Sequence, residues 1–135
     1  MNDEASVQFN VKFEKAESTG RYVRGFASVI EEHGVPVGPD FQGDVIEMSE
    51  LRKAAHQYVT DARIGKVMHS GEHIADVVES VLIDDDFAKA LGLTDSRRGW
   101  WIGMEIHSEA VQKRVLSGEL KAFSIGGKGT RVPAE

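Results

Sequence analysis

The chain has 135 residues, 41% hydrophobic and 28% charged, so it can bury one hydrophobic core and is too short for two. Its formal net charge of −6 argues against a nucleic-acid-binding protein, because that affinity comes from lysine and arginine side chains that neutralise phosphates. Cysteine is absent, which excludes disulfides and thiol catalysis, and no stretch approaches the roughly 18 apolar residues of a spanning helix, so we expect a soluble, cytoplasmic protein.

The first half of the sequence predicts two strands, a loop and a helix. Apolar and polar residues alternate over residues 7–13, and a second extended run covers residues 22–30. Their spacing suits an antiparallel hairpin between them. Residues 31–40 are rich in Gly and Pro and are expected to form a long loop. An amphipathic helix over about 49–63 follows, with Ser49 as its expected N-cap.

The second half predicts further strands separated by short helices. The β-branched run over 74–83 predicts a strand with Asp76 and Glu79 on opposite faces. The strand over 99–107 places four large apolar residues on one face: Trp100, Ile102, Met104 and Ile106. The other expected elements are an extended piece over 66–69, a helix over 87–91 that residues 84–86 cap and Gly92 closes, a helix capped by Ser108, and a strand over 121–126.

These elements predict an α+β domain with a mainly antiparallel sheet or a partly closed β-barrel, flanked by short helices. We expect a single domain over residues 1–135, with its core between about residues 6 and 130. No internal repeat or low-complexity segment interrupts the order of elements.

One serine near the end of the chain has the setting of a nucleophile. Ser124 lies in the middle of the apolar run over 121–125, and Gly126 and Gly127 follow it. Strand backbone would fix the hydroxyl, and glycines let a substrate or an oxyanion approach main-chain N–H groups. A serine before a Gly-Gly turn is more often structural, so the interpretation depends on a partner base. His69, at the end of an upstream extended piece, is the candidate.

The motifs around these residues resemble one known family. In chain order the matching pieces are residues 25–29, 36–47, the helix after Ser49, 68–69, 77–80, 99–103 and 117–127. Together they cover roughly residues 20–130, and they resemble the XkdF-like serine proteases of tailed phages, which are related to the prohead, or capsid maturation, proteases. The shared order carries the resemblance, because each piece alone is unspecific.

The resemblance implies a fold like that of the herpesvirus assemblin proteases, a β-barrel flanked by helices. It also implies a serine nucleophile on a strand with an upstream histidine, which carries over to Ser124 and His69. His69 would be the general base that accepts the Ser124 proton. Main-chain N–H groups around Gly126 and Gly127, or the side chain of Arg131, would stabilise the oxyanion.

The third catalytic residue stays open. In the wider group a histidine or carboxylate beyond the serine orients the base, yet only eleven residues follow Ser124 here, and Glu135 is the one acid among them. The alternatives are an upstream residue, a Ser–His dyad, or a piece cut from a longer protein. Glu79 is the preferred upstream candidate, because its strand follows the turn after the base. Glu105 and His107 are the others.

Two histidines four residues apart also suggest a metal site. Glu72 lies between His69 and His73. The order differs from the His-Glu-x-x-His of zinc proteases, a glycine disfavours a helix there, and a third ligand would have to come from His33 or His107. We therefore expect no metal and no cofactor.

Sequence and resemblance together favour a phage or prophage head-maturation serine endopeptidase. We expect it to cleave scaffold, capsid or portal precursors, and itself, in the procapsid that assembles in the host cytoplasm. The resemblance implies a homodimer, and the composition predicts neither a nucleic-acid nor a membrane partner. The alternative is a catalytically inactive protease-like module that serves the phage head as a scaffold or interaction domain.

Overall fold

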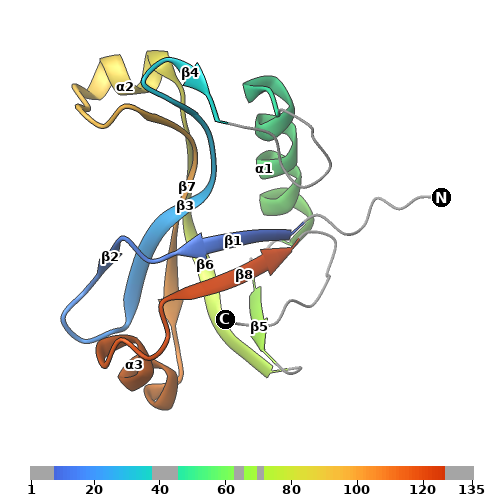
Figure 1. Cartoon of the computed structure of the whole chain (residues 1–135). Helices are drawn as coiled ribbons and strands as arrows, with labels where there is room; N and C mark the ends of the chain where they lie inside the picture. Colours follow the sequence, from blue (N-terminus) through green and yellow to red (C-terminus); the bar gives the residue numbers. More distant parts are fainter. Residues whose placement is uncertain (1–7, 38–45, 63–65, 70–71, 127–135) are drawn as a thin grey trace.

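A computed structural model describes residues 8–37, 46–62, 66–69 and 72–126 of the chain. These residues form eight strands and three helices (Figure 1). In chain order they are β1 (Gln8–Lys12), β2 (Lys15–Ala16), β3 (Tyr22–Glu32), β4 (Val35–Pro36), α1 (Met48–Ala62), β5 (Lys66–His69), β6 (Glu72–Ile83), α2 (Asp85–Leu91), β7 (Arg97–Ile106), α3 (Glu109–Leu116) and β8 (Ala122–Gly126). No helix within these ranges is long and apolar enough to cross a membrane.

The strands pair antiparallel in a sheet and a separate ribbon. The sheet has the order β2-β3-β7-β6-β5, with β4 paired to the end of β3. The ribbon consists of β1 and β8 and crosses the long strands of the sheet (Figure 1). The predicted α+β class with a mainly antiparallel sheet is confirmed. The pairings within the described ranges do not close a barrel.

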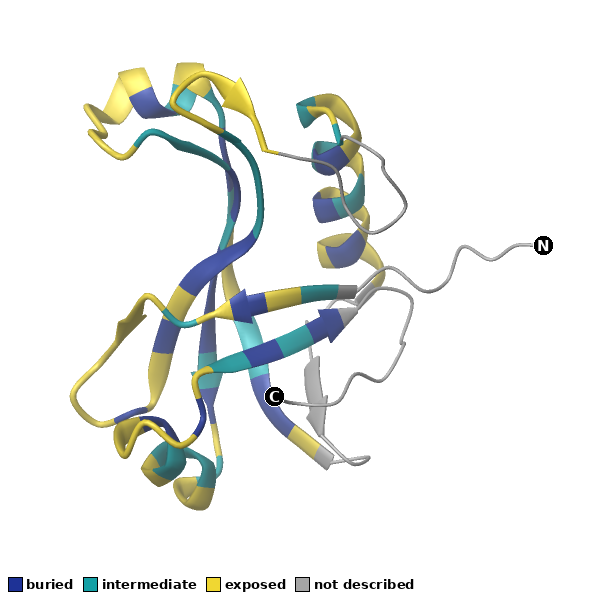
Figure 2. Cartoon of the chain, viewed as in Figure 1, coloured by how far each residue is buried: buried dark blue, intermediate teal, exposed yellow. Residues whose placement is uncertain are grey.

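The core lies between the central strand of the sheet and the elements that cover it. Four residues of β7 are buried on one face, as predicted: Trp100, Ile102, Met104 and Ile106. The ribbon and α1 add a second set of buried side chains: Val11, Leu51, Ala55, Tyr58, Phe123 and Ile125. In Figure 2 the buried positions alternate along β8 and recur turn by turn on α1. The ribbon that carries Ser124 is thus part of the main core.

The expected hairpin between the first two long strands is wrong. β1 pairs with β8, from Gln8 opposite Gly126 to Lys12 opposite Ala122. The chain then crosses β3 and returns as the short strand β2, which is the true hairpin partner of β3. At the crossing, a Cβ atom on Gly25 would lie 2.1 Å from the carbonyl oxygen of Lys12. The crossing therefore requires glycine at this position.

The loop expected over residues 31–40 begins as a hairpin instead. β3 runs to Glu32 and β4 starts at Val35, and the two residues between them, His33 and Gly34, have φ of 57° and 75°. Two consecutive positive φ values are the geometry of a tight two-residue hairpin turn, which glycine adopts without steric cost. Residues 38–40 of the expected loop lie outside the described residues.

The helices follow their predicted capping signals with one exception. Gly92 is the left-handed C-cap of α2 and Ser108 the N-cap of α3, as predicted. Asp84 is the N-cap of α2, but the helix starts at Asp85, two residues before the predicted start, so Asp85 and Asp86 lie in its first turn. α1 begins at Met48, so Ser49 lies inside the first turn and is not the N-cap. The helix is amphipathic as predicted, with Leu51, Ala55 and Tyr58 buried against the sheet, but Val59, which the same spacing places on that face, is exposed.

Tyr58 on α1 provides a test of the core. Its ring packs on Trp100 with centroids 5.6 Å apart, and its hydroxyl has no hydrogen-bond partner among the described residues. Burial, and to a smaller extent the charge of Asp76, raises the pKa of Tyr58 to about 12. We expect Tyr58→Phe to raise the free energy of unfolding by about 1 kcal/mol, because it keeps the ring and removes an unsatisfied hydroxyl. Urea unfolding at pH 7 measures the change.

Tyr22 is the matched control for this substitution. Its exposed hydroxyl donates to Glu105 at 3.4 Å, so Tyr22→Phe should change the unfolding free energy by less than about 0.5 kcal/mol. The raised pKa of Tyr58 contributes stability that is complete below pH 10 and is lost as the pH rises toward 12. The gain in unfolding free energy of Tyr58→Phe over the native chain should therefore grow above pH 10. A destabilised Tyr58→Phe protein would contradict the unsatisfied state of the hydroxyl.

Candidate functional site

β8 fixes the backbone of Ser124 and turns its side chain away from the core. Its neighbours Phe123 and Ile125 are fully buried, whereas Ser124 is partly exposed and pairs with Asn10 of β1. The hydroxyl donates to Asn10 Oδ1 over a long distance of 3.5 Å. Ser124 is thus rigidly placed and accessible, with a weakly engaged hydroxyl, which is the setting that a nucleophile requires.

His69 ends the strand next to β8. It is the last residue of β5, where it pairs with Glu72 of β6. β5 and β8 are in contact, so the strands of the two predicted catalytic residues are neighbours although they are distant in sequence. The side chain of His69 lies outside the described residues, and its role as the base stays a prediction.

The residues predicted to bind the oxyanion follow β8. Gly126 is the last residue of the strand and pairs with Gln8 of β1. Gly127 and Arg131 lie outside the described residues. Ser124 and the predicted oxyanion residues are thus close in sequence, two to seven residues apart, and the oxyanion site itself stays a prediction.

Glu79, the preferred third member, is held by an arginine. Arg24 of β3 donates from Nε to Oε1 at 2.7 Å and from Nη2 to Oε2 at 3.0 Å. These hydrogen bonds lower the pKa of Glu79 below its ordinary value. Both side chains are about half exposed, so the pair contributes little to stability. No hydrogen bond within the described ranges joins Glu79 to Ser124, and its role in orienting the base stays a prediction.

The other two upstream candidates also have partners. Glu105 accepts a hydrogen bond from Arg21 Nε at 2.9 Å. His107 Nε2 lies 2.8 Å from Asp76 Oδ2. In the part of the chain that the structure describes, each upstream candidate is therefore engaged by a residue other than Ser124.

A β-bulge in β6 places Asp76 on the same face as Glu79, and the prediction of opposite faces is wrong. Asp76 pairs with Glu105 and Glu79 pairs with Gly103, with a register shift between the two pairs. Directly opposed residues of an antiparallel pair share a face, and residues two apart on β7 share a face as well. The extra residue, Val78, reverses the alternation of β6.

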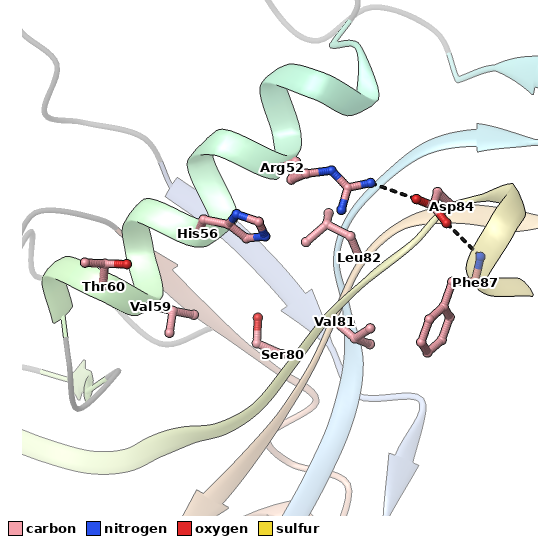
Figure 3. A pocket seen from close by; sticks show the side chains of 9 residues that line it. All are labelled: Arg52, His56, Val59, Thr60, Ser80, Val81, Leu82, Asp84 and Phe87. Carbon is pink, nitrogen blue, oxygen red and sulfur yellow. Dashed lines mark hydrogen bonds and ion pairs between the residues drawn. The ribbon is translucent and has the colours of Figure 1, made fainter.

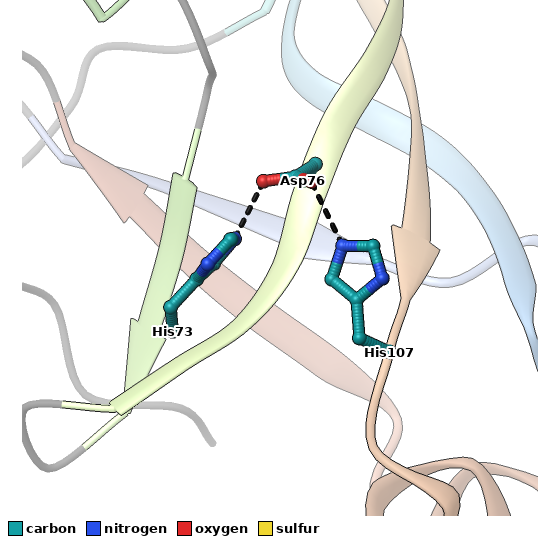
Figure 4. A group of neighbouring side chains, drawn as sticks. All are labelled: His73, Asp76 and His107. Carbon is teal, nitrogen blue, oxygen red and sulfur yellow. Dashed lines mark hydrogen bonds and ion pairs between the residues drawn. The ribbon is translucent and has the colours of Figure 1, made fainter.

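Asp76 joins two histidines in a cluster that the sequence does not predict (Figure 4). Its Oδ1 lies 2.5 Å from His73 Nε2 and its Oδ2 lies 2.8 Å from His107 Nε2. The two imidazole rings meet edge to face, with centroids 5.5 Å apart. Burial opposes ionisation of Asp76, but the hydrogen bonds from His107 and His73 outweigh it and lower the pKa of the carboxyl group. The cluster is a charged polar site at the ends of β6 and β7.

A groove of about 600 Å³ lies between α1 and β6 (Figure 3). Its lining residues are Arg52, His56, Val59, Thr60, Ser80, Val81, Leu82, Asp84 and Phe87. Arg52 donates to Asp84 Oδ2 at 2.7 Å, which ties the helix to the end of β6. Ser124 is not among the lining residues. The sequence gives no signal for this groove, because α1 and β6 meet only through tertiary packing.

Comparison with known proteins identifies the family. Residues 10–133 match the family described as "Putative phage serine protease XkdF". The chain is 30% identical to the uncharacterized protein YqbD of Bacillus subtilis (strain 168) over 127 residues, which cover 88% of this chain and 39% of YqbD. It is 32% identical to the phage-like element PBSX protein XkdF of the same organism over 93 residues, which cover 68% of this chain and 33% of that protein.

The chain spans between about a third and two fifths of the length of these relatives. No solved structure matches it. The family match extends across the described sheet, ribbon and helices and includes both His69 and Ser124. This chain therefore belongs to the XkdF family, whose description is that of a putative phage serine protease.

Proposed function

We propose that this chain is a serine endopeptidase domain of phage head maturation, with Ser124 as the nucleophile and His69 as the general base. The observation that carries the proposal is the position of Ser124. It lies between two buried residues of β8, its hydroxyl faces outward with one long hydrogen bond, and β8 contacts the strand that ends at His69. Membership of the XkdF family supports the same reaction class.

In the proposed mechanism His69 accepts the proton of the Ser124 hydroxyl while Oγ attacks the carbonyl carbon of the scissile peptide bond. Main-chain N–H groups near Gly126 and Gly127, or Arg131, stabilise the negative oxygen of the tetrahedral intermediate. The protonated His69 then gives its proton to the leaving amine. Water hydrolyses the acyl-enzyme by the same proton transfers in reverse order.

Glu79 is the proposed orienting residue for His69, with a Ser–His dyad as the other arrangement of the same reaction. To reach an imidazole, Glu79 must share one of its carboxylate oxygens, since both accept hydrogen bonds from Arg24. In a Ser–His dyad, both oxygens of Glu79 can stay bound to Arg24.

The proposed substrates are the scaffold, capsid or portal precursors of the phage head, and the chain itself. Their cleavage takes place in the assembling procapsid in the host cytoplasm. By family resemblance the protease acts as a homodimer with an assemblin-like fold. The greater length of the two relatives fits a protease domain that is fused to another part of a phage protein.

The test is co-expression of the chain with the scaffold and capsid proteins encoded beside it, followed by intact-mass analysis of all products. We expect discrete cleavage products with Ser124 and none with Ser124→Ala. The product masses locate the cleavage sites. If the scaffold and capsid proteins have the same masses with Ser124 as with Ser124→Ala, the result would contradict the proteolytic activity.

A second candidate function is an inactive protease-like module of the phage head. The engagement of Glu79 by Arg24 and of Glu105 by Arg21 favours it, because both carboxylates are committed to other partners. This function predicts unchanged masses in the same experiment together with stable association of the chain with a head protein. Size-exclusion chromatography of the co-expressed mixture detects that association.

A further inference from the structure

The His73–Asp76–His107 cluster brings together ligands of the kind that transition metals prefer. One nitrogen of each histidine and one carboxylate oxygen all lie within 4.8 Å of one another. The side chains are 34%, 21% and 42% exposed, respectively, so an ion from solution has access to all three. Imidazole nitrogen with one carboxylate is a common ligand set for zinc sites that keep a fourth position open.

The backbone holds two of these side chains on one side of β6. His73 and Asp76 are three residues apart and would point to opposite faces of a regular strand. The pairing of β5 with β6 shifts register between Val67 and Met68, which pair with Ala75 and His73, so Ile74 is an extra residue on β6. This bulge turns His73 toward Asp76.

The third side chain is anchored to the same bulge. His107 follows the last residue of β7, and its main-chain N–H donates to the carbonyl oxygen of Ile74 at 3.1 Å. This bond continues the pairing of β7 with β6 and places the His107 ring beside Asp76, as Figure 4 shows. The cluster thus depends on main-chain hydrogen bonds at the bulge and not on chance contact between long surface side chains.

We propose that His73, Asp76 and His107 form a binding site for a divalent transition metal of the zinc class. Zinc binds nitrogen and oxygen ligands at about 2.0–2.1 Å, so tetrahedral ligand atoms lie roughly 3.4 Å apart. His73 Nε2 and His107 Nε2 lie 2.5 and 2.8 Å from different oxygens of Asp76. Binding through one of these oxygens therefore requires small shifts of the carboxylate and the two rings, and the three ligand atoms already lie within 4.8 Å of one another. Water fills the fourth position.

The ion would link the β5–β6 hairpin to the end of β7 and the start of α3. An ion that binds only the folded chain stabilises it in proportion to the logarithm of the metal concentration over the dissociation constant. The ligand set does not include Ser124, whose hydroxyl hydrogen bonds to Asn10. The inference does not depend on proteolytic activity.

The test is calorimetric titration of the EDTA-treated chain with zinc chloride. We expect one zinc ion per chain, and a loss of affinity of at least about tenfold in His73→Ala, Asp76→Asn and His107→Ala. His56→Ala is the control, because His56 is exposed on α1, outside the cluster, and this variant should bind as the native chain does. Urea unfolding without metal verifies that each variant is folded.

Cobalt(II) gives a second readout that does not depend on stability. A tetrahedral cobalt spectrum should appear with the native chain and with His56→Ala and should be absent with Asp76→Asn, which keeps the size of the side chain and removes its charge. Two results would overturn the proposal. One is no saturable zinc binding by the native chain, and the other is equal affinity in the native chain and the three cluster variants.

Discussion

Replacing His69 by alanine should slow the reaction of Ser124 with a fluorophosphonate by about three orders of magnitude or more, because the hydroxyl then has no base to accept its proton. The reagent needs no knowledge of the natural substrate. Ser124 Oγ attacks phosphorus, fluoride leaves, and the chain gains the mass of one phosphonyl group. Intact mass spectrometry over time measures the rate. Ser124→Ala should give no adduct at all.

The double variant His69→Ala/Ser124→Ala should behave as Ser124→Ala does, since residues that act as one unit have non-additive effects. His56→Ala and Ser49→Ala are matched controls on α1 and should react at the native rate. A native rate in His69→Ala would contradict its role as the base. An adduct on Ser124→Ala would place the reactive serine elsewhere.

Glu79→Gln separates the triad from the dyad in the same assay. If Glu79 orients His69, the rate should fall by about two orders of magnitude or more, because the base loses its orienting charge. If the pair is a dyad, the substitution removes only the exposed ion pair with Arg24, and the rate should stay within a few-fold of native. Arg24→Gln breaks the same ion pair but keeps Glu79. It is therefore the control for the structural effect of losing that ion pair.

The parts of the fold that follow from local patterns could be predicted from the sequence. The buried face of β7 is a period-two pattern of four large apolar residues. The boundaries of α2 and α3 follow from Asp84, Gly92 and Ser108, whose side chains or backbone satisfy the helix ends without help from the rest of the molecule. Each signal lies within a few residues of the feature that it predicts.

Strand pairing and register depend on distant parts of the chain and could not be predicted. The spacing of the first two long strands favoured a hairpin, but β1 buries Val11 by pairing with β8 at the other end of the chain. No residue near β1 signals that partner. The bulges at Ile74 and Val78 have the same origin, since an extra residue in a strand is defined only by the partner strand.

This difference explains which site residues the sequence could identify. The local pattern around Ser124 and the family resemblance both point to Ser124 and His69, and the strands that carry them are neighbours. Asp76 was missed, because its contacts with His73 and His107 exist only once the bulges have set the register of β6. A metal site built on histidine spacing alone paired His69 with His73, whereas the described cluster pairs His73 with His107.

Gly25→Ala should lower the free energy of unfolding by about 3 kcal/mol or more. The new Cβ would lie 2.1 Å from the carbonyl oxygen of Lys12 and 3.1 Å from its carbonyl carbon. Both atoms belong to the backbone, so no side-chain rotation relieves the clash. β1 must move away from β3, and with it moves β8, whose residues Phe123 and Ile125 fill the core.

Gly92→Ala is the control, because it adds the same methyl group without a clash. Nothing lies within 4 Å of a Cβ atom at Gly92, and its φ of 67° costs an alanine only about 1 kcal/mol. Urea unfolding of both variants and the native chain measures the difference. A Gly25→Ala chain as stable as Gly92→Ala would contradict the tight crossing of β1 over β3. Gly25→Ala should also slow phosphonylation of Ser124 under native conditions, because the clash displaces the strand that positions the nucleophile.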